Sequence, residues 1–309
     1  MKAGTDILTL AELTPADLRE ILDLAKEQKA AYAAGGWSER PLAGKAAALI
    51  FMKPSMRTRV SFEVACGRLG LQPVVLGGSD SVFSRGETVE DTTRVLERYT
   101  DVIVIRTFEQ SLVERIAEVA SVPVVNALTD DYHPCQILAD LLTIEEHLGR
   151  LTGVKVAYVG DGNNIANTLL LGCPLAGVNL AIATPPGYEP LPQAVANGER
   201  IAGGTGTAIH DGHDPAEAVR GADVVVTDTW TSMGQEAEHD ARLAAFAAFQ
   251  VTPELMSGAS AEAIFMHCMP AHRGEEVVPA VIDGPRSVII DEAANRLHAQ
   301  QALLTLVVG

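Results

Sequence analysis

The chain has 309 residues, 47% of them hydrophobic and 20% charged, so it is long and apolar enough to bury the cores of two domains, with one large α/β domain as the alternative. Forty acidic residues against 23 basic ones give a net charge of −17, which argues against nucleic acid or an anionic membrane surface as the main partner. No apolar run approaches the roughly 18 residues of a membrane helix. The four cysteines lie far apart without a C-x-x-C pair, which predicts a reduced, cytoplasmic protein.

The first predicted element is a helix that begins at Thr14-Pro15, an N-cap followed by proline at the first helical position. Short apolar runs then alternate with amphipathic stretches, which is typical of βαβ units with parallel sheets. One such stretch, 87–99, places Leu96 and Tyr99 on one helical face, and the glycine-rich 203–206 is expected to be a turn before a strand. The predicted strands are 46–52, 73–76, 101–105 and 122–126 in a first series, and 154–160, 178–183, 205–209, 222–227 and 263–267 in a second.

Two long helices, 135–149 and 292–306, are predicted outside this alternation. We therefore expect an α/β protein of two domains, each a parallel sheet flanked by helices, linked by two long interdomain helices. Ligands of open parallel sheets bind beyond the carboxyl ends of the strands, so the residues after each strand are the candidates for a site. The expected parts are a first domain at 1–134, a connecting helix at 135–149, a second domain at 150–291 and a C-terminal helix at 292–309 that packs back on the first domain.

The segment after the first predicted strand has the features of an anion site. Ser55 is placed as the N-cap of a helix, and Arg57, Thr58 and Arg59 follow in the first turn. Arginines are unfavourable at this positive end of the helix dipole, whereas backbone donors, hydroxyls and a guanidinium together suit phosphate. Because successive residues diverge around a helix, we expect Arg57 to reach the ligand and Arg59 to be structural. A surface turn with two solvated arginines is the alternative.

Polar residues also follow the next strands of the first series. Arg106 comes directly after 101–105, and His133 and Gln136 flank the start of the connecting helix. Each of these positions points to the same edge of the sheet as the anion site. His133 and Gln136 can bond a planar amide, although a lone histidine is more often structural.

In the second series, Gly160-Asp161-Gly162-Asn163-Asn164 comes close to the dinucleotide fingerprint but has Ile165 in place of the third glycine, and no acidic residue ends the next strand. We therefore expect no nicotinamide cofactor. Asp228 follows the strand 222–227, with Ser232 four residues on, and this pair suits an amino or ammonium group; a helix cap is the alternative. Cys268 follows 263–267, where buried packing is the alternative role.

Five segments, in this order along the chain, resemble the aspartate/ornithine carbamoyltransferase family. They are Ser55-Met56-Arg57-Thr58-Arg59, His133-Pro134-Cys135-Gln136, Asp228 to Gly234, His267-Cys268-Met269-Pro270 and Asn295-Arg296-Leu297-His298. The third and fourth are similar to the ornithine branch. The resemblance implies transfer of a carbamoyl group from carbamoyl phosphate to the δ-amine of L-ornithine, giving citrulline and phosphate. It further implies a homotrimer, or a multiple of it, with sites at subunit interfaces and no metal or organic cofactor.

The resemblance also implies a role for each matching residue. The expected catalytic residues are Arg57, Arg106, His133, Asp228 and Cys268. The expected carbamoyl-phosphate ligands are Ser55, Met56, Arg57, Thr58, Arg106, His133, Gln136, Cys268, Met269 and Arg296. The expected ornithine ligands are Asn164, Asp228, Ser232 and Met233, with Asn163 as the alternative to Asn164. Val82 stands where many members have a glutamine that reaches the neighbouring subunit's site, which puts that contact in doubt.

Three alternatives stay open from the sequence. The acceptor can be N-acetyl- or N-succinylornithine, or putrescine, in place of ornithine. A non-catalytic relative can keep the fold and bind small molecules without turnover. The sequence is also compatible with either arginine synthesis or arginine breakdown.

Overall fold

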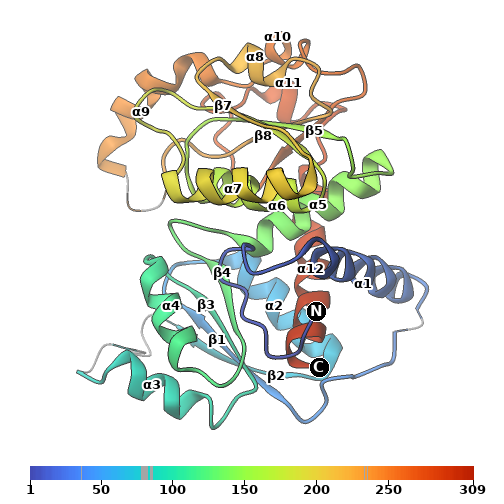
Figure 1. Ribbon diagram of the computed structural model, residues 1–309, viewed down its shortest axis with the longest axis vertical. Helices are drawn as coiled ribbons and strands as arrows, with labels where there is room; N and C mark the ends of the chain where they lie inside the picture. Colours follow the sequence, from blue (N-terminus) through green and yellow to red (C-terminus); the bar gives the residue numbers. More distant parts are fainter. Residues whose placement is uncertain (36, 78–82, 84–85, 233, 235) are drawn as a thin grey trace. The chain divides into compact units, whose positions relative to one another are not determined.

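The computed structural model describes residues 1–35, 37–77, 83, 86–232, 234 and 236–309. The chain divides into two compact units, Met1–Leu142 with Ala294–Gly309, and Thr143–Ala293. Each unit holds one parallel sheet flanked by helices, which confirms the predicted fold class (Figure 1). Both unit boundaries fall inside long helices, α5 (Pro134–Leu148) and α12 (Ile289–Val308), so each of these helices contributes residues to both units.

The sheet of the first unit has the strand order β2-β1-β3-β4, and every neighbouring pair is parallel. Helices α3 and α4 cover one face, and α2 and α12 lie on the other (Figure 1). Near the chain ends, Gly4 N donates to Val307 O at 2.9 Å. The strands are β1 (Ala46–Phe51), β2 (Gln72–Gly77), β3 (Val102–Arg106) and β4 (Val124–Leu128), and the helices are α1 (Pro15–Ala33), α2 (Met56–Leu69), α3 (Val89–Leu96) and α4 (Gln110–Val119).

The sheet of the second unit has the order β7-β6-β5-β8-β9, again all parallel. Helices α6 and α7 lie on one side of it, and α8, α10 and α11 on the other (Figure 1). The strands are β5 (Lys155–Val159), β6 (Asn179–Ala183), β7 (Ile209–Gly212), β8 (Val224–Thr227) and β9 (Ile264–His267). The helices are α6 (Asn164–Leu175), α7 (Pro192–Thr205), α8 (Pro215–Val219), α9 (His239–Phe246), α10 (Pro253–Met256) and α11 (Pro279–Ile282).

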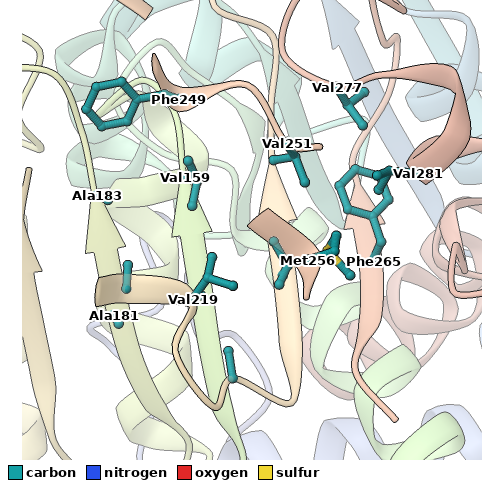
Figure 2. Packing of buried hydrophobic residues seen from close by; sticks show 14 of the residues in the cluster. Val159, Ala181, Ala183, Val219, Phe249, Val251, Met256, Phe265, Val277 and Val281 are labelled. Carbon is teal, nitrogen blue, oxygen red and sulfur yellow. The ribbon is translucent and has the colours of Figure 1, made fainter. Parts of the chain in front are cut away.

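Buried apolar side chains fill the space between this sheet and α8, α10 and α11 (Figure 2). Val159 and Ala183 come from the strands, Val219 from α8, Met256 from α10 and Val281 from α11, and all five are buried. Burying such side chains contributes about 25 cal/mol per Å² of apolar surface, so this core fixes the strands whose ends carry polar residues.

The prediction for the glycine-rich segment 203–206 was wrong. Helix α7 continues through it to Thr205 and ends at Gly206, whose φ of +75° is the left-handed conformation that glycine adopts without a steric penalty. The strand expected at 205–209 therefore begins later, at Ile209. Glycine-rich runs favour turns, but here only the last glycine of the run ends the helix.

Candidate active site

In each sheet the strand order reverses at one place, between two neighbouring strands. Polar residues that the sequence singles out lie at the ends of these strands. In the first unit the reversal is between β1 and β3; in the second it is between β5 and β8. Adjacent loops leave such a switch point in opposite directions, which opens a crevice at the carboxyl ends of the strands. Residues 53–58 follow β1 and Arg106 is the last residue of β3, whereas Asn163 and Asp228 follow β5 and β8.

Thr58, in the first turn of α2, is the acceptor for two arginines in the first unit. Arg106 Nη1 donates to Thr58 Oγ1 at 3.3 Å, and Arg296 Nη2 donates to the same oxygen at 2.6 Å. Thr58 and Arg296 are almost fully buried. Because the oxygen accepts from both arginines, the hydroxyl keeps its own proton for donation to a ligand. The cluster therefore combines two positive charges and a hydroxyl donor, a set suited to a partly anionic oxygen.

His133 lies beside this cluster and is buried. Burial, and then the positive charges of Arg296 and Arg106, lower the pKa of His133 well below its ordinary value of 6.5. Near neutral pH the imidazole is therefore uncharged, with one N–H donor and one acceptor nitrogen. A neutral histidine can donate a hydrogen bond to a carbonyl oxygen without adding a third charge to the site.

The start of α2 has the composition of an anion-binding helix terminus. Ser55 occupies the N-cap position as predicted, but its side chain makes no capping hydrogen bond, and the first turn contains no acidic residue. The first backbone N–H groups of a helix have no intrahelical partner and are available to an anion. Arg57 is half-buried, Met56 is exposed, and Arg59 is exposed and pairs with Glu63 at 2.6 Å. Arg59 thus has a structural partner on its own helix.

Gln136, in the first turn of α5, is fully buried and donates from Nε2 to Asp140 Oδ1 at 2.8 Å. This bond fixes the orientation of the amide, since the nitrogen end faces the carboxylate one turn along the helix. The carbonyl end of the amide is then the one suited to an N–H donor of a ligand.

In the second unit, Asp228 accepts two hydrogen bonds. Asn163 Nδ2 donates to its Oδ2 at 2.8 Å, and Cys268 Sγ donates to its Oδ1 at 3.0 Å. Asn163 also caps α6 through its Oδ1, which accepts from Ile165 N at 2.9 Å. Sequence reasoning placed Asp228 and Cys268 after different strands; the structure brings them together because β8 and β9 are neighbours.

A buried histidine and carboxylate support the segment that carries Cys268. Met269 N donates to His267 Nδ1 at 2.9 Å, so His267 Nε2 carries the proton and donates to Glu276 Oε1 at 3.2 Å. His267 N also donates to Glu292 Oε2 at 2.8 Å. His267, Glu276 and Glu292 are all buried. Sequence reasoning named His267 only as part of a motif and missed both glutamates, because nothing local links them to it.

The ligand atoms of Asp228, His267 and Cys268 lie within 4.8 Å of one another. All three are engaged in the hydrogen bonds described above, so they would have to give these up to bind an ion. The set therefore acts as a hydrogen-bond network around the Asp228 carboxylate and the Cys268 thiol.

The loop after β5 that resembles a dinucleotide fingerprint is packed against the chain itself. A Cβ on Gly162 would lie 2.3 Å from Glu189 C, and Gly162 N donates to Tyr188 O at 2.9 Å. The glycine thus serves a close approach of residues 188–190, where a dinucleotide fingerprint would use it for a pyrophosphate.

Some of the remaining positions singled out from the sequence lie within the described residues, and others do not. Asn164 begins α6 and is half-buried, Ser232 is half-buried after β8, and Met269 follows Cys268 in the second unit. Met233 and Val82 lie outside the residues that the structure describes.

Comparisons with known proteins agree on one family. Residues 5–146 match the family model described as the carbamoyl-P binding domain of aspartate/ornithine carbamoyltransferase, and residues 152–307 match its Asp/Orn binding domain. The ornithine carbamoyltransferase of Carboxydothermus hydrogenoformans is 53% identical over 306 residues, covering 99% of this chain and 98% of that protein.

Solved structures give the same result. The ornithine carbamoyltransferase of Pyrococcus furiosus superposes with a TM-score of 0.96 at 49% identity, covering 99% of this chain and 98% of the other. That of Gloeobacter violaceus gives a TM-score of 0.90 at 47% identity, with both chains covered completely. The fold and the motifs at its switch points define a carbamoyltransferase. The chain belongs to the aspartate/ornithine carbamoyltransferase family.

Proposed function

We propose that this protein transfers the carbamoyl group of carbamoyl phosphate to the δ-amine of L-ornithine, releasing L-citrulline and phosphate. The observation that carries the proposal is the pair of arginines on Thr58, beside a neutral His133, at the switch point of the first sheet. The names of the relatives, at about half identity over nearly the whole chain, support ornithine as the acceptor.

In the reaction, the amine nitrogen bonds to the carbamoyl carbon, the bond from that carbon to the phosphate oxygen breaks, and the amine loses a proton. Negative charge grows on the carbonyl oxygen and on the departing phosphate. Thr58, Arg106 and His133 are assigned to the carbonyl oxygen, and the α2 start with Arg57 to the phosphate. Donors already in place at such atoms are the main source of transition-state stabilisation, and each contributes about 3–4 kcal/mol.

The other expected contacts complete the carbamoyl-phosphate site. Ser55 and the Met56 backbone lie at the start of α2, which suits phosphate. The fixed amide of Gln136 presents its oxygen to the carbamoyl NH₂. Arg296 is held at this site by the hydrogen bond that it donates to Thr58. Cys268 and Met269 are proposed as further carbamoyl-phosphate ligands because they stand at positions that match the family's motif.

The acceptor side is assigned to the second unit. The Asp228 carboxylate suits the ammonium group of ornithine, and Asn164, Ser232 and Met233 suit its other polar and apolar atoms. Asn163 is occupied by the α6 cap and by Asp228, which supports Asn164 over Asn163 as the ligand. An N-acylated amine has no charge for Asp228 to meet, and a buried unpaired carboxylate is costly.

The nucleophile must be neutral. An alkylamine with a pKa of about 10.4 costs roughly 4.6 kcal/mol to deprotonate near pH 7. Asp228 and Cys268 lie together where they can orient the amine, and either this network or the departing phosphate accepts the proton.

The test is citrulline formation by the purified protein with carbamoyl phosphate and four acceptors: L-ornithine, N-acetylornithine, N-succinylornithine and putrescine. We expect ornithine to have a kcat/KM at least ~100-fold above the others, because a site built for polar groups rejects analogues that leave those groups unpaired. The N-acylated acceptors lack the ammonium group for Asp228, and putrescine lacks the carboxylate of ornithine. Comparable turnover of N-acetylornithine would overturn the acceptor assignment. Absence of product with every acceptor would favour a non-catalytic binding protein.

We also propose that the protein forms a homotrimer. Met56, Val60 and Val64 lie four residues apart on one face of α2 and are 72%, 55% and 40% exposed in the single chain. Strand β2 is an edge strand, and its Val74 is exposed as well. Exposed apolar stripes of this kind mark contacts with other chains. Because the stripe begins at Met56, a second copy that covers it would lie beside the carbamoyl-phosphate site.

Sedimentation tests the assembly. We expect about three times the 32.6 kDa of the chain, or a multiple of that, and a smaller species for Val60→Glu. A monomeric, fully active protein would contradict the proposal.

The four cysteines are free thiols, which supports a reducing, cytoplasmic location.

A further inference from the structure

Lys53 is a buried cation at the carboxyl end of β1, directly before the segment that carries Ser55, Arg57 and Thr58. Its side chain is 3% exposed, and its ammonium forms an ion pair with Asp130. A buried charge is stable only if it is paired, so the position of this ammonium is set by the groups around it.

The partners of Lys53 come from the two other strand ends of the same site. Asp130 follows β4 in the loop that leads to His133, and the Phe108 ring, 4.2 Å from the ammonium, follows β3 two residues after Arg106. Asp130 N also donates to Phe108 O at 2.8 Å. A single ammonium thus contacts the loops after β1, β3 and β4.

Each of these three loops carries a residue of the site. The β1 loop leads into the first turn of α2 with Thr58, β3 ends at Arg106, and the β4 loop carries His133. The loops are also joined by backbone bonds at their bases, since Met52 N donates to Arg106 O at 2.9 Å and Thr107 N donates to Leu128 O at 3.0 Å. Beyond these bases, the Lys53 ammonium is a charged group that contacts residues of the loops after β3 and β4 from the loop after β1.

We propose that Lys53 and Asp130 are positioning residues for carbamoyl transfer: their ion pair, with Phe108 over the ammonium, sets the spacing of the α2 start, Arg106 and His133. The inference rests on the proposed function, because it concerns the geometry of that site. A misplacement of about 1 Å at a catalytic group can cost ~100-fold in rate, so a pair outside the substrate can still control kcat.

A direct contact of Lys53 with phosphate is the competing explanation, and the two make different predictions for Asp130. If Lys53 binds phosphate, removing Asp130 frees the ammonium, and carbamoyl phosphate binds as well or better. If the pair positions the loops, losing either partner has the same effect, and losing both adds little more. A double-mutant cycle separates these cases.

The experiment compares Lys53→Met, Lys53→Arg, Asp130→Asn and the Lys53→Met/Asp130→Asn double variant. Arg115→Met is the matched control, because Arg115 pairs with Glu90 at 2.8 Å in the same unit on the surface of α4. We measure kcat, KM for carbamoyl phosphate, and the urea midpoint of each protein. A drop in kcat at an unchanged midpoint cannot come from loss of fold alone.

We expect Lys53→Met and Asp130→Asn each to lower kcat by ~10–100-fold, with the double variant within threefold of the worse single one. Lys53→Arg should recover most of the activity, and Arg115→Met should match the unmodified protein. Additive losses, or full activity in Asp130→Asn, would overturn the proposal. If the unmodified protein makes no citrulline, the proposed function fails, but the pairing of Lys53 with Asp130 is not thereby refuted. The urea midpoints of the single and double variants then test the pairing without reference to activity.

Discussion

The guanidinium of Arg296 donates a 2.6 Å hydrogen bond to the hydroxyl of Thr58, although the two residues lie 238 positions apart in the chain. Arg296 comes from α12 and Thr58 from the first turn of α2, so the last helix completes a site that the first sheet begins. Arg106 donates to the same oxygen from the end of β3. The hydroxyl is thus the point where three distant segments meet.

Thr58→Val should remove this meeting point while keeping the shape of the side chain. The two arginines then lose a common acceptor, and the carbonyl oxygen of the substrate loses a donor. We expect kcat to fall by ~10²–10³-fold, whereas Thr58→Ser, which keeps the hydroxyl, should stay within about tenfold. Steady-state kinetics with both substrates saturating gives the comparison. Near-normal kcat in Thr58→Val would mean that the hydroxyl only fills space.

Arg57→Ala and Arg59→Ala should differ, although the two arginines are two residues apart. Arg57 is half-buried at the start of α2, which is the proposed phosphate site, whereas Arg59 is exposed and paired with Glu63. Removing a charge-assisted phosphate contact should cost several kcal/mol in kcat/KM for Arg57→Ala. An exposed i,i+4 pair contributes about 0.3–0.5 kcal/mol, so Arg59→Ala should change activity little. Equal losses in two folded variants would remove the distinction.

The lowered pKa of His133 predicts a dependence of stability on pH. In the unfolded chain this histidine takes up a proton below about pH 6.5, whereas in the folded protein it stays neutral. The unfolded state then binds more protons, so stability from this group is present above pH 6.5 and is lost as pH falls, by at most about 1.4 kcal/mol per pH unit.

The measurement is the urea midpoint between pH 7.5 and 5 for the unmodified protein and for His133→Gln. The difference between the two should shrink or reverse towards acid pH, because the variant lacks the titrating group. His213→Gln is the control, since His213 is about half exposed. Parallel curves for His133→Gln and the unmodified protein would show that His133 ionises alike in both states.

Much of the candidate site's place in the fold could be predicted from the sequence, because it depends on local signals. Apolar runs bounded by polar residues gave the strand ends, and the rule for parallel sheets then singled out Thr58, Arg106, His133 and Asp228. The observed strands begin and end within a few residues of the predicted ones, apart from β7.

Contacts between distant segments could not be predicted in the same way. Periodicity says which face of a helix is buried and nothing about its partner, so the Arg296–Thr58 bond and the Lys53–Asp130 pair had no sequence signal. Boundaries were a second source of error. The sequence places Tyr99 on the same helical face as Leu96 in a helix over 87–99, but α3 ends at Leu96 and Tyr99 is 73% exposed. A side chain beyond the helix end no longer follows the helical period.

The bond from Cys268 to Asp228 predicts how activity depends on pH. For the unmodified protein, kcat/KM for ornithine should rise between about pH 6 and 8.5, as the acceptor amine or the group that takes its proton is deprotonated. The thiol donates to Asp228 Oδ1 and offsets part of the carboxylate's charge. Cys268→Ala removes this donor, so the carboxylate should hold an ammonium group more strongly, and the rise should move to higher pH.

Cys268→Ser keeps a donor at the same position, so its profile should stay near that of the unmodified protein or move slightly towards lower pH, even if the maximum falls. Cys66→Ala is the control, because Cys66 is buried in α2 and burial raises its thiol pKa to about 12, far outside the range. The profiles are recorded with carbamoyl phosphate saturating. If Cys268→Ala and Cys268→Ser lose rate but keep the same apparent pKa, the thiol only packs against Asp228, and the proton must leave the amine by a route that does not involve it.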